Sequence, residues 1–300
     1  MRLAVVGAAG LLGQKLFEAA TVAGHEVAPF DLDTGIQTPA GPISPLDITD
    51  AGAVMAAMEG LGPDWVLNTA AFTAVDASEA NQERVRAVNV GGVANILSAT
   101  DATGTRLVTL STDYVFDGRN GPYTEDAPRR PLGVYGASKA EMEDIVVKDG
   151  GRHLVIRTMV LYGAASGIRT NFALWVVQKL RAGEKIRVVT DQMGNPTLAS
   201  DLARMILTMV EHGGAGLYHA AGADRVSRYE FAVRAARIFG LDGDKIIPVT
   251  TGELGQEADR PLESGFVLDR LRSDFGIQPA GLDESLALFR EEVEKYGDGM

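Results

Sequence analysis

The length, composition and charge of the chain exclude several classes of protein. Its 300 residues are 46 % hydrophobic and 23 % charged, which suits a globular protein of about two domains. It has no cysteine, so a disulfide framework, a thiolate metal site and a cysteine nucleophile are excluded. The net charge of −12 argues against broad binding to nucleic acid or to an anionic membrane. No signal-peptide pattern and no apolar run of roughly 18 residues is present, so we expect a soluble, cytoplasmic protein.

Short apolar runs alternate with amphipathic segments through the first half of the chain. The pattern predicts strands over 3–6, 26–30, 65–67, 106–110 and 154–157, helices over 12–23, 50–58, 79–98 and 139–147, and a surface loop over 34–45. Strands that alternate with helices form parallel sheets covered by helices on both faces. We therefore expect an α/β protein with a Rossmann-like, doubly wound parallel sheet.

Beyond about residue 158 the pattern loosens, and the predicted elements are shorter and separated by more loop residues. Helices or strands are predicted over 171–182, 186–189, 227–239 and 283–296, while a helix over 201–210 and a strand over 216–220 return to the main sheet. We expect a dinucleotide-binding domain over 1–157, joined by 198–222. Residues 158–197 and 223–300 are expected to form a smaller C-terminal substrate-binding lobe.

Three glycines lie between the first predicted strand and the first predicted helix. Gly7, Gly10 and Gly13 form a G-x-x-G-x-x-G pattern. Side chains at such positions would keep the backbone away from a pyrophosphate, and the helix N-terminus offers N–H donors and partial positive charge to it. Because the pattern falls in the first strand–helix unit, it predicts dinucleotide binding.

A carboxylate at the end of the second predicted strand bears on the choice of dinucleotide. Asp31 is placed to accept hydrogen bonds from the ribose hydroxyls of an adenosine, with Asp33 close behind. A carboxylate there repels a 2′-phosphate, and no arginine lies within 30–37 to bind one. The sequence therefore favours NADH over NADPH, with solvated turn carboxylates as the alternative interpretation.

A threonine, a tyrosine and a lysine form the candidate catalytic group. Thr112 follows a buried strand, so its side chain is expected at the carboxyl edge of the sheet, where open α/β sheets bind ligands. Tyr135 and Lys139 are one helical turn apart and share a helix face. We expect the ammonium of Lys139 to lower the pKa of Tyr135. Tyr135 would then pass a proton to a carbonyl oxygen that receives hydride from a nicotinamide, while Thr112 orients that oxygen.

Specific motifs occur along nearly the whole chain. They include GAAGLLG (7–13), LDITD (46–50), LSTDYVFDG (110–118), VYGASK (134–139), VVTDQMGNPT (188–197) and DRPLESGFVLD (259–269). The combination of STDYVFDG, VYGxSK and DQ-x-G-x-PT is specific. With these motifs the chain resembles the extended short-chain dehydrogenase/reductase superfamily and, more narrowly, the dTDP-4-dehydrorhamnose reductase (RmlD) family. The resemblance implies a Rossmann-like fold and reduction of a keto sugar nucleotide.

The resemblance also implies roles for individual residues. It implies Thr112, Tyr135 and Lys139 as the catalytic group, and Asn89 as the residue that supports the catalytic helix. Tyr135 and Lys139 are also expected to contact the cofactor, together with Gly7, Gly10, Leu11, Leu12, Gly13, Asp31, Asp47, Ile48, Ala70, Ala71, Phe72 and Thr73. The expected substrate contacts come from Thr112, Asp113, Val160, Asn171, Gln192 and Arg260.

One stretch departs from the family pattern. Where the family has R-T-S-W-V-Y-G, this chain places Met159 and Val160 in the positions of the serine and the tryptophan. The loss of the large aromatic face weakens stacking on the sugar. Some family members, regulatory subunits of methionine adenosyltransferase, have a similar V-L-Y-G, so a non-catalytic regulatory subunit stays an alternative.

Other polar residues of the second half have plainer interpretations. Arg260 precedes a proline and suits a diphosphate, because a guanidinium is a rigid bidentate donor. Asn195 and Thr197 also match family motifs and are either substrate contacts or loop-bracing residues. His219 lies in an apolar run and is expected to be structural. None of the 4 histidines has a spacing such as H-x-x-x-H, so no metal site is predicted.

Taken together, the sequence predicts an NADH- or NADPH-dependent reductase of a 4-keto sugar nucleotide, with Tyr135 as the proton donor. A nucleotide-sugar epimerase or dehydratase of the same superfamily is the enzymatic alternative, because Asp113 could serve as a carboxylate base beside Thr112. The expected partner is a nucleotide-sugar substrate, with no nucleic acid and no membrane. The sequence leaves a homodimer open.

Overall fold

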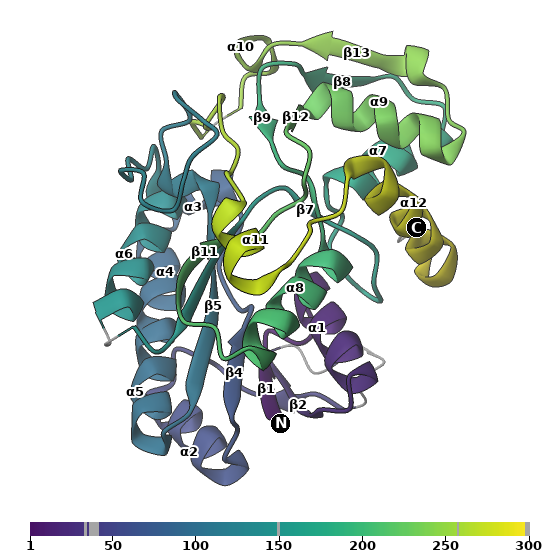
Figure 1. The fold of residues 1–300 in the computed structure, drawn as a ribbon. Coiled ribbons are helices and arrows are strands. Elements are labelled where there is room, and N and C mark those ends of the chain that lie inside the picture. Colours follow the sequence, from purple (N-terminus) through teal and green to yellow (C-terminus); the bar gives the residue numbers. More distant parts are fainter. Residues whose placement is uncertain (33–34, 36–41, 149–150, 257, 298–300) are drawn as a thin grey trace.

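A computed structural model describes the chain except for residues 33–34, 36–41, 149–150, 257 and 298–300. Asp33 and most of the loop predicted over 34–45 lie outside the described residues. The chain folds into a larger part built around one sheet and a smaller part above its carboxyl edge (Figure 1). Within the described residues, no helix has the length and apolarity that a membrane crossing requires.

The larger part is centred on a seven-stranded sheet in the order β11-β6-β5-β4-β1-β2-β3, and every neighbouring pair is parallel. Its strands are β1 (Arg2–Val6), β2 (Glu26–Asp31), β3 (Ser44–Pro45), β4 (Trp65–Asn68), β5 (Arg106–Thr112), β6 (Leu154–Thr158) and β11 (Gly216–His219). The strand order reverses at β1, which creates the switch point where such sheets bind ligands. The predicted doubly wound parallel sheet is confirmed.

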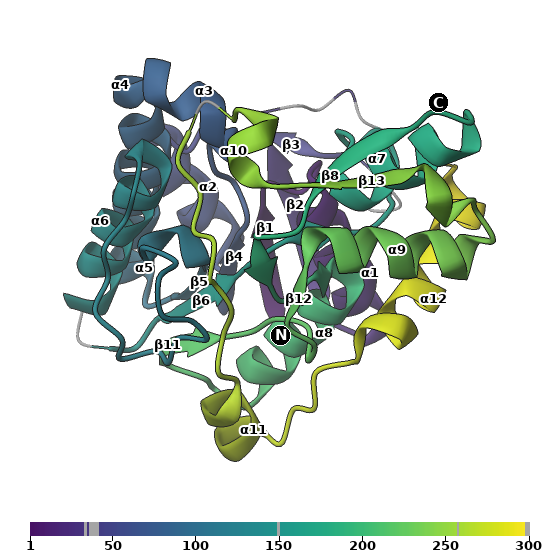
Figure 2. The ribbon, with the colours of Figure 1, turned by 90° about the horizontal axis from the view of Figure 1, so that it is seen from above.

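Helices cover both faces of the sheet, as Figure 2 shows from above. One face is covered by α1 (Leu11–Val22) and α8 (Ala199–Glu211), and the other by α2 (Ala51–Leu61), α5 (Val93–Thr103) and α6 (Val134–Lys148). Strand residues alternate between these layers, so Leu3 and Val5 pack toward α1 and α8 while Ala4 and Val6 pack toward the other helices. Apolar runs without alternation are therefore buried on both sides.

The long helix predicted over 79–98 is wrong, because the segment is broken into four pieces. They are α3 (Val75–Ala80), α4 (Gln82–Arg86), the π-helical η1 (Ala87–Gly92) and the start of α5. Asn81 leaves helical geometry with φ −124° and ψ 38°, and the side chain of Asn89 bonds to the loop after β4. These tertiary contacts outweigh the helical periodicity. The helix predicted over 139–147 also begins earlier, at Val134, so that Tyr135 lies in its first turn.

The smaller part packs its helices around a second apolar core that includes Tyr162, Phe231 and Phe289. Its principal elements are α7 (Phe172–Arg181), β8 (Ile186–Val189), α9 (Arg228–Phe239), β13 (Ile246–Val249) and α12 (Leu282–Tyr296). β8 and β13 form a parallel pair. The remaining short elements of the whole chain are η2 (Asp113–Val115), which directly follows β5, β7 (Leu161–Tyr162), β9 (Met193–Gly194), β10 (Thr197–Leu198), β12 (Val226–Ser227), η3 (Gly243–Lys245), α10 (Thr251–Leu254) and α11 (Asp269–Phe275).

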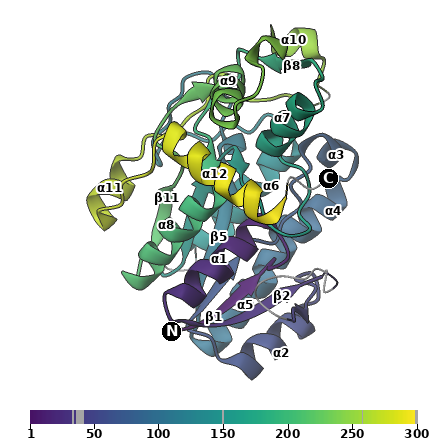
Figure 3. The ribbon, with the colours of Figure 1, turned by 90° about the vertical axis from the view of Figure 1, so that its right-hand side faces the viewer.

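The chain returns from the smaller part to the main sheet before leaving it again. After β10, α8 packs on α1 and β11 pairs with β6, while the last helix, α12, lies in the smaller part. Figure 3 looks onto α1, α8 and α12 and shows the last helix beside the first one. A salt bridge of 3.0 Å between Lys15 of α1 and Glu292 of α12 joins the two parts there.

Candidate active site

The glycine turn after β1 is shaped for close approach by a ligand backbone or phosphate. Gly7 has φ +84°, and a Cβ there would lie 2.5 Å from Oγ1 of Thr69. A Cβ on Gly13 would lie 2.1 Å from the carbonyl oxygen of Gly7, so only glycine lets α1 pack this tightly against the turn. Gly10 caps α1 without a side-chain hydrogen bond, which leaves the N-terminal N–H groups of the helix directed out of its first turn.

Asp31 lies at the end of β2, next to the glycine turn. Its Oδ2 accepts a hydrogen bond of 2.8 Å from the backbone N–H of Ala9. The carboxylate therefore helps to fix the turn and carries negative charge at its edge. Leu11 and Leu12 follow in the first turn of α1, and the Leu12 side chain is buried in the core. Any contact of Leu12 with a cofactor would come from its backbone.

The remaining predicted cofactor residues lie in two loops at the same edge of the sheet. Asp47 accepts hydrogen bonds from Thr49, and Ile48 is buried, with its carbonyl accepting from Asn95. The second loop, between β4 and α3, holds Ala70, Ala71, Phe72 and Thr73. Because β1, β2, β3 and β4 are parallel neighbours, their carboxyl ends bring these loops to the same edge of the sheet as the glycine turn.

Asn89 ties the β4 loop to the helix that carries Tyr135 and Lys139. Its side chain accepts from the Phe72 N–H at 2.8 Å and donates to the Phe72 carbonyl at 3.1 Å. The same amide donates to Oγ of Ser138 on α6 at 3.0 Å. Asn89 is 1 % exposed and lies in the π-helical segment, a type of distortion that frequently marks functional sites. It therefore links the predicted cofactor loop to the predicted catalytic helix.

Thr112, Tyr135 and Lys139 come together at the carboxyl end of β5. Thr112 is 6 % exposed, and its hydroxyl donates to Oδ1 of Asp113 at 3.1 Å. Thr112 also lies close enough to the hydroxyl of Tyr135 to affect its pKa. Lys139 donates from Nζ to the carbonyl oxygen of Leu110 at 3.0 Å. The three predicted side chains thus converge, from β5 and from one face of α6.

The expectation that Lys139 lowers the pKa of Tyr135 is wrong for this structure. Burial raises the pKa of Tyr135, the negative charge of Asp113 adds to the rise, and the hydrogen bond with Thr112 only partly offsets them. Burial likewise lowers the pKa of Lys139 to about 8, against an opposing effect of Glu143. At neutral pH Tyr135 therefore keeps its proton, which is the state that a proton donor requires.

A cavity lined by residues of both parts of the molecule opens beside this group. Asp113, Val160, Gln192 and Arg260, four of the predicted substrate residues, line it. Thr112 and Asn171 do not line it. The side chain of Asn171 caps α7 and donates to the carbonyl of Gly163. The remaining lining residues are Tyr114, Met193, Gly194, Pro196, Val226, Ser227, Arg228 and Pro261.

Two guanidinium groups and one carboxylate determine the charge of the cavity. Arg260 donates to the hydroxyl of Tyr114 at 2.9 Å and to the carboxylate of Asp76 at 2.7 Å, and its buried Nε has no partner. Burial lowers the pKa of Arg228, while Tyr114 and Asp113 oppose that effect. Burial raises the pKa of Asp113, whose Oδ2 accepts from Ser264 at 2.9 Å.

Sequence reasoning missed Arg228 and Tyr114. Arg228 is the first residue of α9, where a positive side chain opposes the helix dipole. That unfavourable placement is the one signal in the sequence that could have identified it. Tyr114 follows the predicted Thr112 and Asp113, and its ring packs edge-on against Tyr135 at a centroid distance of 5.6 Å. No spacing rule connects Tyr114 with Arg260.

Val160 has an unusual backbone at the wall of the cavity. Its φ of +47° is the only positive value at a non-glycine residue in the described part of the chain. A β-branched residue in this region is strained, and such strain clusters at functional sites. A hydrogen bond from the Thr197 N–H to the Val160 carbonyl holds the turn. Met159 beside it is buried. This part of the wall therefore has no aromatic side chain at the two positions where the family pattern has serine and tryptophan.

No group of three or more His, Asp or Glu side chains placed to hold a metal ion occurs among the described residues. His219 is buried in β11, its ring stacks on Phe266 at 4.0 Å, and burial lowers its pKa to about 3. It is therefore neutral and packed within the core at neutral pH.

Comparison with known proteins identifies the family. The family described as RmlD substrate binding domain matches residues 1–295. A dTDP-4-dehydrorhamnose reductase of Streptomyces griseus is 35 % identical over 288 residues, covering 93 % of this chain and 89 % of that protein. A dTDP-4-keto-6-deoxy-D-glucose reductase of Streptomyces niveus is 34 % identical over 267 residues, covering 87 % of this chain and 86 % of that protein.

A solved structure is similar over the whole fold. The dTDP-4-dehydrorhamnose reductase of Bacillus anthracis, crystallised in complex with NADP, is 31 % identical with a TM-score of 0.88, covering 97 % of this chain and 99 % of that one. The prediction of an NAD(P)-type cofactor is confirmed at the level of the family. By its sequence and its fold, the chain belongs to the RmlD family of NAD(P)-dependent oxidoreductases.

Proposed function

We propose that this protein is an NAD(P)H-dependent reductase of a 4-keto sugar nucleotide, similar in activity to dTDP-4-dehydrorhamnose reductase. The observation that supports the proposal is the convergence of Thr112, Tyr135 and Lys139 at the carboxyl end of β5, next to Asp113 and Tyr114, which line the cavity. From this position Tyr135 would be close both to a cofactor bound at the sheet edge and to a substrate bound in the cavity. The relatives described above reduce keto groups of dTDP sugars according to their names.

The residues at the sheet edge fit a dinucleotide. The glycine turn is so tight that a Cβ at Gly7 or Gly13 would collide with the backbone. We propose that a pyrophosphate binds against this turn, where α1 offers uncapped N–H groups. In this proposal the carboxylate of Asp31 accepts hydrogen bonds from the ribose hydroxyls of the adenosine. A nicotinamide bound here supplies hydride to the keto carbon. Phe72 and its neighbours, held by Asn89, would line the central part of the cofactor site.

In this proposal Tyr135 donates the proton and Thr112 orients the keto oxygen. Because the pKa of Tyr135 is raised, its hydroxyl is protonated before the reaction and gives up its proton as negative charge develops on the oxygen. Thr112 lies close enough to Tyr135 to affect its pKa, which supports the proposal that both hydroxyls address the same oxygen atom. Lys139, while protonated, favours the transient phenolate.

The charged end of the cavity suits the diphosphate of the sugar nucleotide. Arg228 and Arg260 are two cations on its wall, and guanidinium groups bind phosphate oxygens in pairs. Gln192, whose amide also bonds to Thr251 and Gln256, would contact the substrate from the same lobe as the two arginines. We propose residues 1–157 with 198–222 as the dinucleotide domain, and 158–197 with 223–300 as the substrate lobe. A cytoplasmic homodimer stays a prediction.

The proposal is tested by following the absorbance of reduced nicotinamide with a panel of 4-keto nucleotide sugars. We expect net oxidation of NADH or NADPH by at least one of them, and no oxidation without the sugar. Running both cofactors also tests whether Asp31 favours NADH. The proposal is wrong if the folded protein oxidises neither cofactor with any member of the panel.

Asp113 favours one alternative function. This buried carboxylate lines the cavity next to Thr112, and burial raises its pKa, so it could move a proton in an epimerase or dehydratase. Enzymes of that kind return the hydride to the sugar. A conversion of the nucleotide sugar with tightly held cofactor and no net oxidation would therefore replace the proposed reductase with this alternative.

A further inference from the structure

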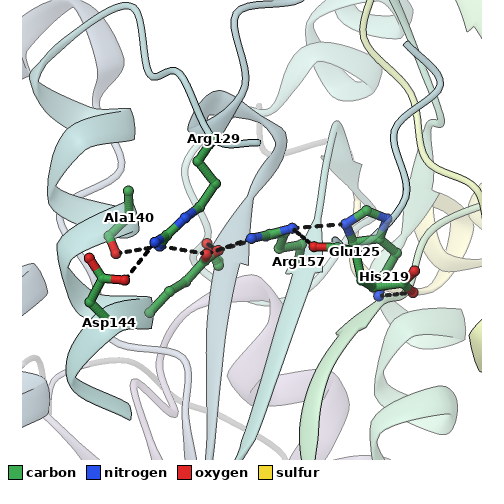
Figure 4. A network of polar contacts seen from close by, with 8 residues as sticks. Glu125, Arg129, Ala140, Asp144, Arg157 and His219 are labelled. Carbon is green, nitrogen blue, oxygen red and sulfur yellow. Dashed lines mark hydrogen bonds and ion pairs between the residues drawn. The ribbon is translucent and has the colours of Figure 1, made fainter. Parts of the chain in front are cut away.

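A buried carboxylate that the proposed reaction does not use lies directly behind the candidate catalytic group. Glu143 is 1 % exposed, and it accepts hydrogen bonds from three side chains. The hydroxyl of Ser111 donates to it at 2.5 Å, Arg157 donates twice at 2.7 Å, and Arg129 donates at 3.1 Å. Figure 4 shows Arg129 and Arg157 within this network of polar contacts. Burying a charged carboxylate costs free energy unless hydrogen-bond partners and opposite charges surround it, as they do here.

The position of Glu143 in the helix connects it to the candidate catalytic pair. Tyr135, Lys139 and Glu143 follow one another at intervals of one helical turn, so they share one face of α6. On that face Lys139 bonds to the carbonyl of Leu110 and Glu143 bonds to Ser111. These are the two residues of β5 that precede Thr112. The face is therefore fastened to the strand that presents Thr112.

The charges around the carboxylate define its electrostatic effect. Arg157 extends beyond Glu143 to the carbonyl of Glu125 and to His219, whose lowered pKa keeps it neutral. Arg129 also binds Asp144, an exposed carboxylate on α6. Tyr135 precedes Lys139 by one helical turn, and Asp113 and Tyr114 lie close enough to raise the pKa of Tyr135. Of all these groups, Glu143 is the one whose charge raises the pKa of Lys139 against the effect of burial.

We propose that Glu143 is a positioning residue for Tyr135 and Lys139: it holds their face of α6 against β5 and supplies negative charge on the side of Lys139. The proposal rests on the proposed function, because it assigns Lys139 a role in that reaction. Glu143 touches neither the cavity nor the glycine turn, so it acts through Lys139. A solely structural ion pair would stabilise the fold without affecting the protonation of Lys139.

Two substitutions separate charge from geometry. Glu143→Gln keeps the shape and removes the charge, whereas Glu143→Asp keeps the charge and withdraws it by one methylene. We expect the titration midpoint of Lys139 to fall by about one pH unit in Glu143→Gln. In Glu143→Asp it should stay within about half a unit of wild type. Glu141→Gln is the matched control, because Glu141 lies on the same helix but pairs with Arg86 at the surface.

Two readouts are measured on each folded variant. The first is the pH dependence of turnover with the holoenzyme, whose alkaline limb should move to lower pH in Glu143→Gln alone. The second is the NMR titration of ¹³C-labelled lysine side chains, with Lys139 assigned by Lys139→Arg. The second readout needs no substrate, so it remains decisive if wild type shows no turnover and the proposed function fails.

Glu143→Gln leaves Arg157 without a counter-charge and could fail to fold. In that case Glu143→Gln with Arg157→Gln removes both charges together, and a smaller fall in the Lys139 midpoint is expected relative to wild type, because the loss of the arginine partly offsets the loss of the carboxylate. The proposal is overturned if the Lys139 midpoint in the folded Gln variant equals that of wild type. It is equally overturned if Glu143→Gln and Glu143→Asp shift the midpoint by the same amount.

Discussion

At the scale of single residues, the chemistry of the site depends on which groups surround one hydroxyl. Tyr135 lies against Thr112 and Tyr114, with Asp113 close enough to raise its pKa. The tyrosine, the lysine and the threonine were predictable because each lies at a fixed place in a strand–helix unit. The direction in which the pKa of Tyr135 shifts was not predictable. The pattern Y-x-x-x-K contains neither the burial of the phenol nor the carboxylate of Asp113, the residue that follows Thr112.

The lowered pKa of Lys139 makes a prediction for the pH dependence of turnover. Burial lowers this pKa to about 8, so the side chain is charged below that pH and loses its charge as pH rises through it. Since the ammonium favours the transient phenolate, we expect kcat to fall as pH rises above about 8. A pH–rate profile of wild type measures it, with a profile that stays flat from pH 7 to 10 as the contradicting result.

Arg228 should contribute to substrate binding. Its guanidinium lines the cavity, and loss of one charged hydrogen bond costs about 1.5–3 kcal/mol, which is about 10- to 100-fold in affinity. We expect Arg228→Gln to raise KM for the nucleotide sugar by that factor with a smaller effect on kcat. Arg237→Gln, at the other end of α9 and paired with Asp283 at the surface, is the control. An unchanged KM in Arg228→Gln would remove Arg228 from the substrate site.

At the scale of elements, those that depend on neighbouring residues were predictable from the sequence, and those that depend on distant contacts were not. The glycine turn and the strands of the sheet were predictable, because a turn of three glycines after an apolar run depends on neighbouring residues alone. The break at Asn81 and the π-helical segment at Asn89 were not, since the side chain of Asn89 finds its partners, Phe72 and Ser138, far along the chain. A helical period cannot report such partners.

The glycine turn leads to a prediction about cofactor binding. A Cβ on Gly13 would lie 2.1 Å from the Gly7 carbonyl, so Gly13→Ala must displace α1 from the turn. We expect at least a 10-fold loss of affinity for NADH and NADPH, measured by calorimetry or fluorescence titration. Gly60→Ala is the control, since Gly60 lies in α2 with nothing within 4 Å of the added Cβ. That variant should bind normally and gain about 0.5–1 kcal/mol in stability.

If Gly13→Ala binds both cofactors as tightly as wild type, the turn is not the pyrophosphate site. The structural part of this prediction can be read separately, from the melting temperature of the variant. A displaced α1 should also weaken the packing of Leu12 and Leu16 against the sheet.

At the scale of the whole molecule, the cavity is built from segments that the sequence separates widely. Asp113 and Tyr114 come from the end of β5, whereas Val160, Gln192, Arg228 and Arg260 come from four segments of the smaller part. The existence of a second lobe could be predicted from the change in pattern after residue 158. Its internal arrangement could not, because the short strands β9 and β12 pair only through tertiary contacts.

The contact between the first and last helices should be a large contributor to stability. Lys15 is 3 % exposed and pairs with Glu292, which also accepts from the Ala164 N–H at 2.9 Å. Removing one partner of a buried pair leaves an uncompensated charge, so we expect Lys15→Met to lower the free energy of unfolding by about 3 kcal/mol. Denaturant unfolding measures the loss.

Two further variants interpret that result. Lys15→Met with Glu292→Gln should recover part of the loss, because no unpaired charge remains. Arg290→Gln breaks an exposed pair with Glu294 on the same helix and should cost no more than about 0.5 kcal/mol. Equal effects of Lys15→Met and Arg290→Gln would show that the contact between the helices is not a buried ion pair in energetic terms.

The transfer of hydride to a keto sugar with Tyr135 as proton donor is tested most directly by isotope transfer. The holoenzyme is supplied with reduced nicotinamide cofactor in which both C4 hydrogens are deuterium and with a 4-keto sugar nucleotide, and the mass of the product is measured by mass spectrometry. We expect one deuterium on the sugar carbon, and a rate about 10²- to 10⁴-fold lower in Tyr135→Phe with cofactor affinity retained. A product without deuterium, or a Tyr135→Phe variant that reduces the sugar at the wild-type rate, would contradict the account.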